Sequence, residues 1–116
     1  MEREKNAFER LVEIDFRDRP ALFQPLTQEL VHMGIEWLGR GWELAEEGKA
    51  IQKIWQLASY QEGVDMTLRL ARLAEELNHH PDIYLGFKRV VVRLTTHKTA
   101  CLTLWDFAMA SRIETL

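Results

Sequence analysis

The sequence predicts an α+β domain in which a four-stranded antiparallel sheet carries three helices packed on one face. Apolar residues recur at helical spacing in three separate segments. Between these segments lie two pairs of short stretches rich in aromatic and β-branched residues, which favour strands. The resulting order, helix–strand–strand–helix–strand–strand–helix, is typical of an antiparallel sheet covered by helices on one side.

The first helix is expected to begin after Thr27, whose hydroxyl can accept a hydrogen bond from the first turn. It should end at Gly39 or Gly41, because glycine readily adopts the left-handed conformation that terminates helices. Two strands are then predicted, one formed by Trp42 and Leu44 and one over residues 50–58. The stretch Glu-Glu-Gly-Lys between them is typical of a turn.

One residue interrupts the pattern of the second strand. Ile51 and Trp55 would share the face that is turned to the core, and Lys53 has the same parity. The alternation of apolar and polar side chains in this strand is therefore imperfect.

The second half of the chain predicts a helix, a hairpin and a final helix. Residues 60–78 place apolar side chains on one broad side of a helix and charged side chains on the other. After Pro81, residues 83–87 and 89–96 are expected to pair as a β-hairpin, because they are strongly strand-forming. The last helix is expected over residues 104–113.

A capping-box pattern marks the start of that last helix. Thr103 lies immediately before it, and Asp106 occupies its third position. Each side chain can then accept a hydrogen bond from the backbone N–H of the other residue, which should fix where the helix begins.

Residues 1–25 are expected to form a charged N-terminal extension, ahead of a domain at residues 26–116. Charged residues of both signs are dense in this extension. Within it, residues 12–16 alternate apolar and charged side chains, which predicts a short strand as the alternative to a poorly anchored arm.

Composition limits the classes of function. A net charge of −3 and an isoelectric point near 5.8 argue against general nucleic-acid binding. No apolar run reaches the length needed to cross a membrane, and the charged first residues lack the apolar segment of a signal peptide. Cys101 is the only cysteine, so no internal disulfide can form, and a reducing, cytoplasmic location is expected.

Two of the four histidines stand side by side in the segment from Glu75 to Asp82. Glu75 and His79 are four residues apart and would share one helix face, where the carboxylate could orient the imidazole. Pro81 disfavours helix at His80, whose ring should therefore point in another direction. Two imidazoles held in different directions are suited to acid–base chemistry.

The spacing of this segment and of later residues resembles the pterin-4a-carbinolamine dehydratase family. Glu-x3-His-His-Pro is followed by an aromatic residue after five positions, a histidine after nine more and an aspartate after eight more. The similarity spans residues 26–114. The residues that match the family's pattern are Glu75, His79, His80, Pro81, Phe87, His97 and Asp106, together with Gly41-Trp42, Leu94-Thr95-Thr96-His97 and Leu102-Thr103.

The resemblance implies the same four-stranded sheet with three helices, assembled as a homodimer or homotetramer. It implies a hydro-lyase of tetrahydrobiopterin recycling, which dehydrates 4a-hydroxytetrahydropterin to quinonoid dihydropterin. Aromatic amino acid hydroxylases make this substrate, and such an enzyme is a possible partner. The pterin is the substrate, and the resemblance implies no metal and no redox cofactor.

The resemblance also suggests a role for each residue of the site. His79 and His80 would transfer protons at the C4a hydroxyl and N5, with the acid and the base unassigned, and His97 would bind the pterin and assist the leaving hydroxyl. Glu75 would orient His79, and Asp106 would support His97 or the edge of the site. The other expected supporting or substrate-binding residues are Asn78, Pro81, Asp82, Thr95 and Thr96.

The sequence departs from the family's pattern in one short segment and at one further residue. Residues 98–101 are Lys-Thr-Ala-Cys where glycines are usual, which would limit how closely the backbone approaches a pterin. Ile83 stands where an aromatic residue could stack on the pterin. Both departures concern affinity and substrate choice more than the chemistry.

Other interpretations of these residues are less favoured. Three histidines can hold zinc, but adjacent histidines diverge, and neither a cysteine ligand nor an HExxH-type spacing accompanies them. Cys101 lies four residues after His97, but a Cys–His nucleophile would lack an oxyanion-hole motif. His32 is expected to be structural or merely exposed, and the four tryptophans to lie in the core or at a subunit interface.

A second class of function is a non-catalytic, partner-binding protein on the same fold. Proteins similar to this family include a transcription-factor dimerisation cofactor and a Rubisco assembly factor. The charged extension and the altered residues 98–101 are compatible with such a role. An exposed apolar patch on Ile14, Phe16 or Trp105, away from the histidines, would favour it.

Overall fold

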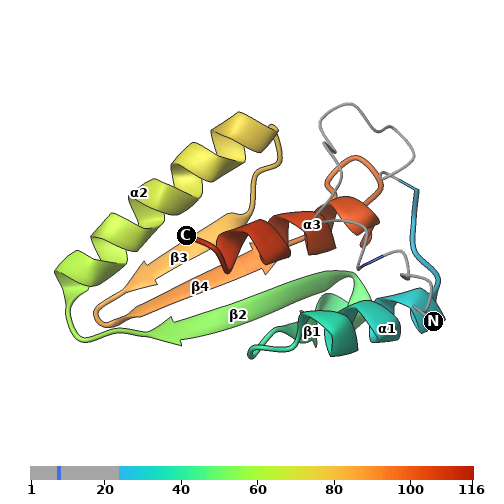
Figure 1. Ribbon diagram of the computed structural model, residues 1–116, viewed down its shortest axis with the longest axis horizontal. Coiled ribbons are helices and arrows are strands. Elements are labelled where there is room, and N and C mark those ends of the chain that lie inside the picture. The colour runs from blue at the N-terminus through green and yellow to red at the C-terminus, as the bar shows by residue number, and fades with distance from the viewer. Residues whose placement is uncertain (1–7, 9–23) are drawn as a thin grey trace, which may run out of the picture.

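The computed structural model describes Phe8 and residues 24–116, and within them it confirms the expected α+β fold (Figure 1). Four strands form one antiparallel sheet in the order β1-β2-β4-β3. The helices are α1 (Gln28–Leu38), α2 (Tyr60–Leu77) and α3 (Leu104–Ile113). The strands are β1 (Glu43–Ala45), β2 (Ala50–Gln56), β3 (Asp82–Gly86) and β4 (Arg89–Leu94), and the 3-10 turn η4 (Glu46–Gly48) joins β1 to β2. The strand expected over residues 12–16 lies outside the described residues.

Polar caps set where the helices begin. Thr27, Ser59 and Thr103 each accept a hydrogen bond from a backbone N–H in the first turn of the helix that follows. The first helix ends at Gly39, with φ of 54°, and the second at Asn78, with φ of 52°. The earlier of the two candidate glycines is therefore the one that terminates α1.

The core lies between the helices and one face of the sheet. Ile51 of β2 and Val90, Val92 and Leu94 of β4 point to this face and are fully buried. The last helix, α3, lies between α2 and α1 and contacts both (Figure 1). Because α3 is central, most of its side chains are buried, including the charged Asp106.

Lys53 of β2 lies on the helix-covered face, as its parity predicts, and finds a partner there. Its ammonium group forms an ion pair with Glu114, at the end of α3, and lies 4.8 Å from the centre of the Trp55 ring. The same Glu114 oxygen accepts the Trp42 Nε1–H at 2.8 Å. The imperfect alternation of β2 thus marks a mostly buried charge pair.

Phe8, from the charged N-terminal segment, belongs to the core. It is fully buried, and its ring centre lies 5.2 Å from that of Phe107, edge to face, and 5.7 Å from that of Trp37. Gly34 of α1 makes room for this cluster, since a Cβ there would lie 2.5 Å from Phe107 and 2.8 Å from Phe8. The core therefore includes a residue that precedes the expected domain boundary.

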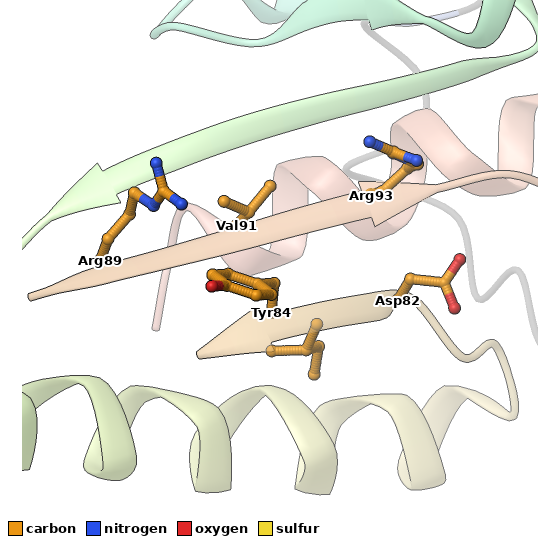
Figure 2. A pocket seen from close by; sticks show the side chains of 6 residues that line it. Asp82, Tyr84, Arg89, Val91 and Arg93 are labelled. Carbon is orange, nitrogen blue, oxygen red and sulfur yellow. The ribbon is translucent and has the colours of Figure 1, made fainter. Parts of the chain in front are cut away.

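The other face of the sheet is left open by the described helices. Ile54 of β2 and Tyr84 of β3 are 43% and 56% exposed on it. A shallow hollow of about 370 Å³ lies over β3 and β4 on this face (Figure 2). It is lined by Asp82, Ile83, Tyr84, Arg89, Val91 and Arg93. In the part of the chain that the structure describes, no helix is both long and apolar enough to span a bilayer.

Candidate functional site

The histidine pair follows a tight turn at the end of α2. Asn78 adopts the left-handed conformation, with φ of 52° and ψ of 43°, which asparagine tolerates better than most residues. The His79 N–H then bonds back to the Ala74 carbonyl at 3.1 Å, as in a Schellman motif. This turn takes His79 off the helix, and with it off the α2 face that carries Glu75.

The His79 ring is buried and paired with a carboxylate. It is 6% exposed, and its Nε2 lies 2.7 Å from Oδ1 of Asp106, which is fully buried. The ring also packs edge to face against Trp105, with the ring centres 5.8 Å apart. Because both members of the pair are shielded from water, the carboxylate is a strong partner that fixes the direction of the imidazole.

Asp106 is itself held by the start of α3 and by the segment that follows β4. Its Oδ2 accepts hydrogen bonds from the Thr103 N–H at 3.0 Å and from the Thr96 hydroxyl at 2.8 Å. The hydroxyls of Thr96 and Thr103 are 2.7 Å apart, and both residues are buried. The expected capping box is confirmed, and its aspartate is the residue that reaches His79.

His80 points toward solvent, so the two adjacent histidines diverge as expected. Its Nε2 lies 3.5 Å from Oε2 of Glu75, and the two side chains are 52% and 80% exposed. An ion pair this exposed to water contributes little and holds neither group firmly.

Two expected partnerships are corrected by this geometry. Glu75 does not orient His79: its carboxylate lies beside His80, because the left-handed turn at Asn78 breaks the four-residue relation along the helix. Asp106 is expected to support His97 or the edge of the site, and the imidazole that it contacts is that of His79, because the start of α3 packs against the end of α2.

His97 completes the histidine cluster from the other side. Its Nε2 lies 3.3 Å from the backbone carbonyl oxygen of His80, and its side chain is exposed. The turn after it is closed by a hydrogen bond from the Ala100 N–H to the His97 carbonyl at 3.3 Å. Ala100 has φ of 54°, a conformation in which glycine is far less strained than alanine. The departure from glycine in residues 98–101 thus places a strained alanine beside the cluster.

The other expected site residues have separate surroundings. The Thr95 hydroxyl donates to the Lys49 carbonyl at 2.8 Å, at the start of β2. Asp82 lines the hollow on the open face of the sheet (Figure 2). Asn78 supplies the turn before His79, and Pro81 is partly buried.

The sequence does not predict that Thr103 and Trp105 contact the site. It indicates only that Thr103 caps a helix and that Trp105 is an apolar residue of the core or an interface. The available signal was the Thr-x2-Asp spacing of the capping box. Its link to His79 depends on how α3 packs against the end of α2, which no local pattern reveals.

The site holds the His79 imidazole against a buried carboxylate, and the His97 ring lies against the backbone of the exposed His80. Imidazole is the side chain best suited to donate and accept protons near neutral pH. Within the described residues, no group of three or more His, Cys, Asp or Glu side chains is arranged to hold a metal ion. Imidazoles in both buried and exposed surroundings are a chemical basis for proton transfer.

Comparisons with known proteins agree with this fold. A sequence profile described as Pterin 4 alpha carbinolamine dehydratase matches residues 24–116. A protein of Saccharolobus islandicus (strain M.14.25 / Kamchatka #1), provisionally named pterin-4-alpha-carbinolamine dehydratase, is 36% identical over 84 residues. That match covers 72% of this chain and 85% of the relative.

Two solved structures are similar to the chain. A transcriptional coactivator/pterin dehydratase from Brucella melitensis aligns with a TM-score of 0.74 at 26% identity, over 79% of this chain and 97% of that one. A pterin dehydratase-like protein identified as a RuBisCO assembly factor in the alpha-carboxysome aligns with a TM-score of 0.56 at 23% identity, over 67% and 90%. The second likeness concerns the fold alone. Since the profile match extends over most of the sequence, the chain belongs to the pterin-4a-carbinolamine dehydratase family.

Proposed function

We propose that this protein is a 4a-hydroxytetrahydropterin dehydratase that acts by histidine acid–base catalysis. The observation that supports this most is the buried His79–Asp106 pair beside the exposed imidazoles of His80 and His97. Membership of the family supplies the class of substrate. A cytoplasmic setting, a homo-oligomeric assembly and supply of the substrate by an aromatic amino acid hydroxylase are parts of the same proposal.

The proposed reaction moves one proton within the substrate, with the protein as carrier. The bond between C4a and the hydroxyl breaks as the hydroxyl takes a proton and leaves as water. N5 loses its proton, and the electron pair that remains on N5 forms the second bond between N5 and C4a. His79 and His80 carry these two transfers, while His97 binds the pterin and assists the leaving hydroxyl. Positioned acid–base catalysis of this kind typically accelerates a step by about 10²–10⁴-fold.

Stopped-flow measurement of dehydration tests the proposal, with freshly generated 4a-hydroxytetrahydropterin as substrate. The wild type should exceed the spontaneous rate, and His79→Ala and His80→Ala should each lower the catalysed rate by about 10²-fold or more. The loss of rate in the double variant should be smaller than the product of the two single losses, because both residues act on one transition state. His32→Ala, at an exposed position of α1, is the matched control. Full activity in both single variants would contradict the assignment.

A second candidate is a partner-binding protein, and it would replace the first if folded protein gave no acceleration. Trp105 is 2% exposed, so it does not supply the expected apolar patch, and Ile14 and Phe16 lie outside the described residues. Exposed aromatic surface is found instead at the β3–β4 hairpin, where Tyr84 is 56% and Phe87 is 74% exposed. Exposed aromatic side chains that lie close together are typical of surfaces that bind a partner.

A further inference from the structure

The hydrogen bonds around Asp106 run in one direction. The backbone N–H of Thr103 can only donate, so Oδ2 of Asp106 accepts it. The Thr96 hydroxyl gives its single hydrogen to the same oxygen. The hydrogen in the 2.7 Å contact between the two hydroxyls must therefore come from Thr103. The Thr103 oxygen in turn accepts the Trp105 N–H at 3.2 Å.

These hydrogen bonds all end at the carboxylate of Asp106. When it is ionised, this carboxylate carries no hydrogen and can only accept hydrogen bonds. Its second oxygen, Oδ1, lies 2.7 Å from Nε2 of His79. Two acceptors do not approach this closely without a hydrogen between them, so Nε2 carries one. We propose that the Thr103–Thr96 hydroxyl relay orients Asp106 and thereby holds His79 in the tautomer with its hydrogen on Nε2 and its lone pair on Nδ1.

This tautomer decides which atom of His79 works in catalysis, a step that rests on the proposed function. Nδ1 is the ring atom that accepts a proton from the pterin, while the hydrogen on Nε2 stays with Asp106. The imidazolium formed in this way is stabilised by the buried carboxylate. Thr96 and Thr103 are positioning residues, since they act on the substrate only through Asp106 and His79.

Asp106→Asn tests the His79 tautomer directly, because only one orientation of the new amide forms hydrogen bonds with its neighbours. The backbone N–H of Thr103 can only donate a hydrogen bond, so the amide oxygen must take the position of Oδ2. The amide nitrogen then takes the place of Oδ1 and donates to Nε2 of His79. His79 must move its hydrogen to Nδ1, which removes the lone pair that the reaction needs.

Nitrogen-15 NMR of the histidine rings in the full chain reads the tautomer directly. The spectra are taken at a pH where the ring of His79 is neutral, and its signals are identified by their loss in His79→Gln. We expect a protonated Nε2 in the wild type and a protonated Nδ1 in Asp106→Asn. The dehydration rate of Asp106→Asn should fall by about 10²-fold or more, with the protein folded.

Thr96→Val tests the relay, because valine keeps the shape of the side chain and removes the hydroxyl. We expect it to give a mixture of His79 tautomers and a smaller fall in rate than Asp106→Asn, and Thr96→Ser to restore both. Thr67→Val is the matched control, since the Thr67 hydroxyl donates only to the Gly63 carbonyl within α2. A single Nε2–H tautomer in Thr96→Val would overturn the role of the relay.

A wild-type His79 with its hydrogen on Nδ1, or an unchanged tautomer in Asp106→Asn, would overturn the inference as a whole. The proposed function fails separately. If the tautomers change as expected but the wild type does not accelerate dehydration, the inference about His79 stands and the dehydratase assignment does not.

Discussion

His79 and Asp106 are 27 residues apart in sequence and meet through a buried contact of 2.7 Å between Nε2 and Oδ1. The second oxygen of the same carboxylate completes the capping box of α3. One side chain therefore fixes both the direction of an imidazole and the start of a helix.

Removal of that carboxylate should be costly for the fold. Asp106→Ala would leave the Thr103 N–H, the Thr96 hydroxyl and His79 Nε2 without their buried partner. We expect the free energy of unfolding, measured by urea denaturation, to fall by about 3–5 kcal/mol. Asp106→Asn keeps most of these hydrogen bonds and should lose clearly less. Equal losses in the two variants would contradict the assigned directions of the hydrogen bonds to Asp106.

Replacement of Glu75 should have little effect on stability. Its contact with His80 is mostly exposed to water, with the carboxylate side chain 80% exposed. We expect Glu75→Gln to change the free energy of unfolding by no more than about 0.5 kcal/mol and to leave the His79 tautomer unchanged. A shift of the His79 NMR signals toward the other tautomer would show that Glu75 orients this ring after all.

The burial of Phe8 can be tested against another phenylalanine. Phe8→Ala would leave a cavity against Phe107 and Trp37, and we expect a loss of about 3–5 kcal/mol in the free energy of unfolding. Phe87→Ala is the matched control, since Phe87 is 74% exposed and its truncation should cost no more than about 0.5 kcal/mol. Similar values for the two variants would place Phe8 outside the core.

Ala100 offers a stabilising substitution. Its φ of 54° is strained for alanine and allowed for glycine, so we expect Ala100→Gly to raise the free energy of unfolding by about 0.5–1 kcal/mol. Ala58→Gly, in the exposed segment before α2 where φ is not positive, should lower it by a comparable amount. Thermal unfolding of the two variants beside the wild type measures both effects.

The proposed mechanism uses no metal, and chelation tests this directly. Exhaustive treatment with a chelator, followed by removal of the chelator, should leave the dehydration rate unchanged. A loss of rate that zinc restores would show that the histidines hold a catalytic metal instead.

The sequence predicts those parts of the fold that depend on neighbouring residues. Thr27 and Thr103 could be recognised as caps because the groups they satisfy lie within three positions along the chain. The partner of His79 could not, because it depends on which segments pack together after the turn at Asn78. Phe8 could not either, because the apolar residues near it in the sequence, Ala7, Leu11 and Val12, stand among many charged residues and do not reveal which distant segment Phe8 packs against.

The position of Lys53 also bears on how the strands choose their pairing. In the observed alignment, Lys53 is opposite Val92 of β4 and reaches Glu114 from the helix-covered side. A shift of β2 by one residue would turn Ile54 inward and carry the ammonium group to the open face, which would leave the Glu114 carboxylate without its cation. A sheet whose inner face were wholly aliphatic would discriminate less between these alignments. Lys53 therefore contributes to the uniqueness of strand alignment, a property separate from the strength with which the sheet is held.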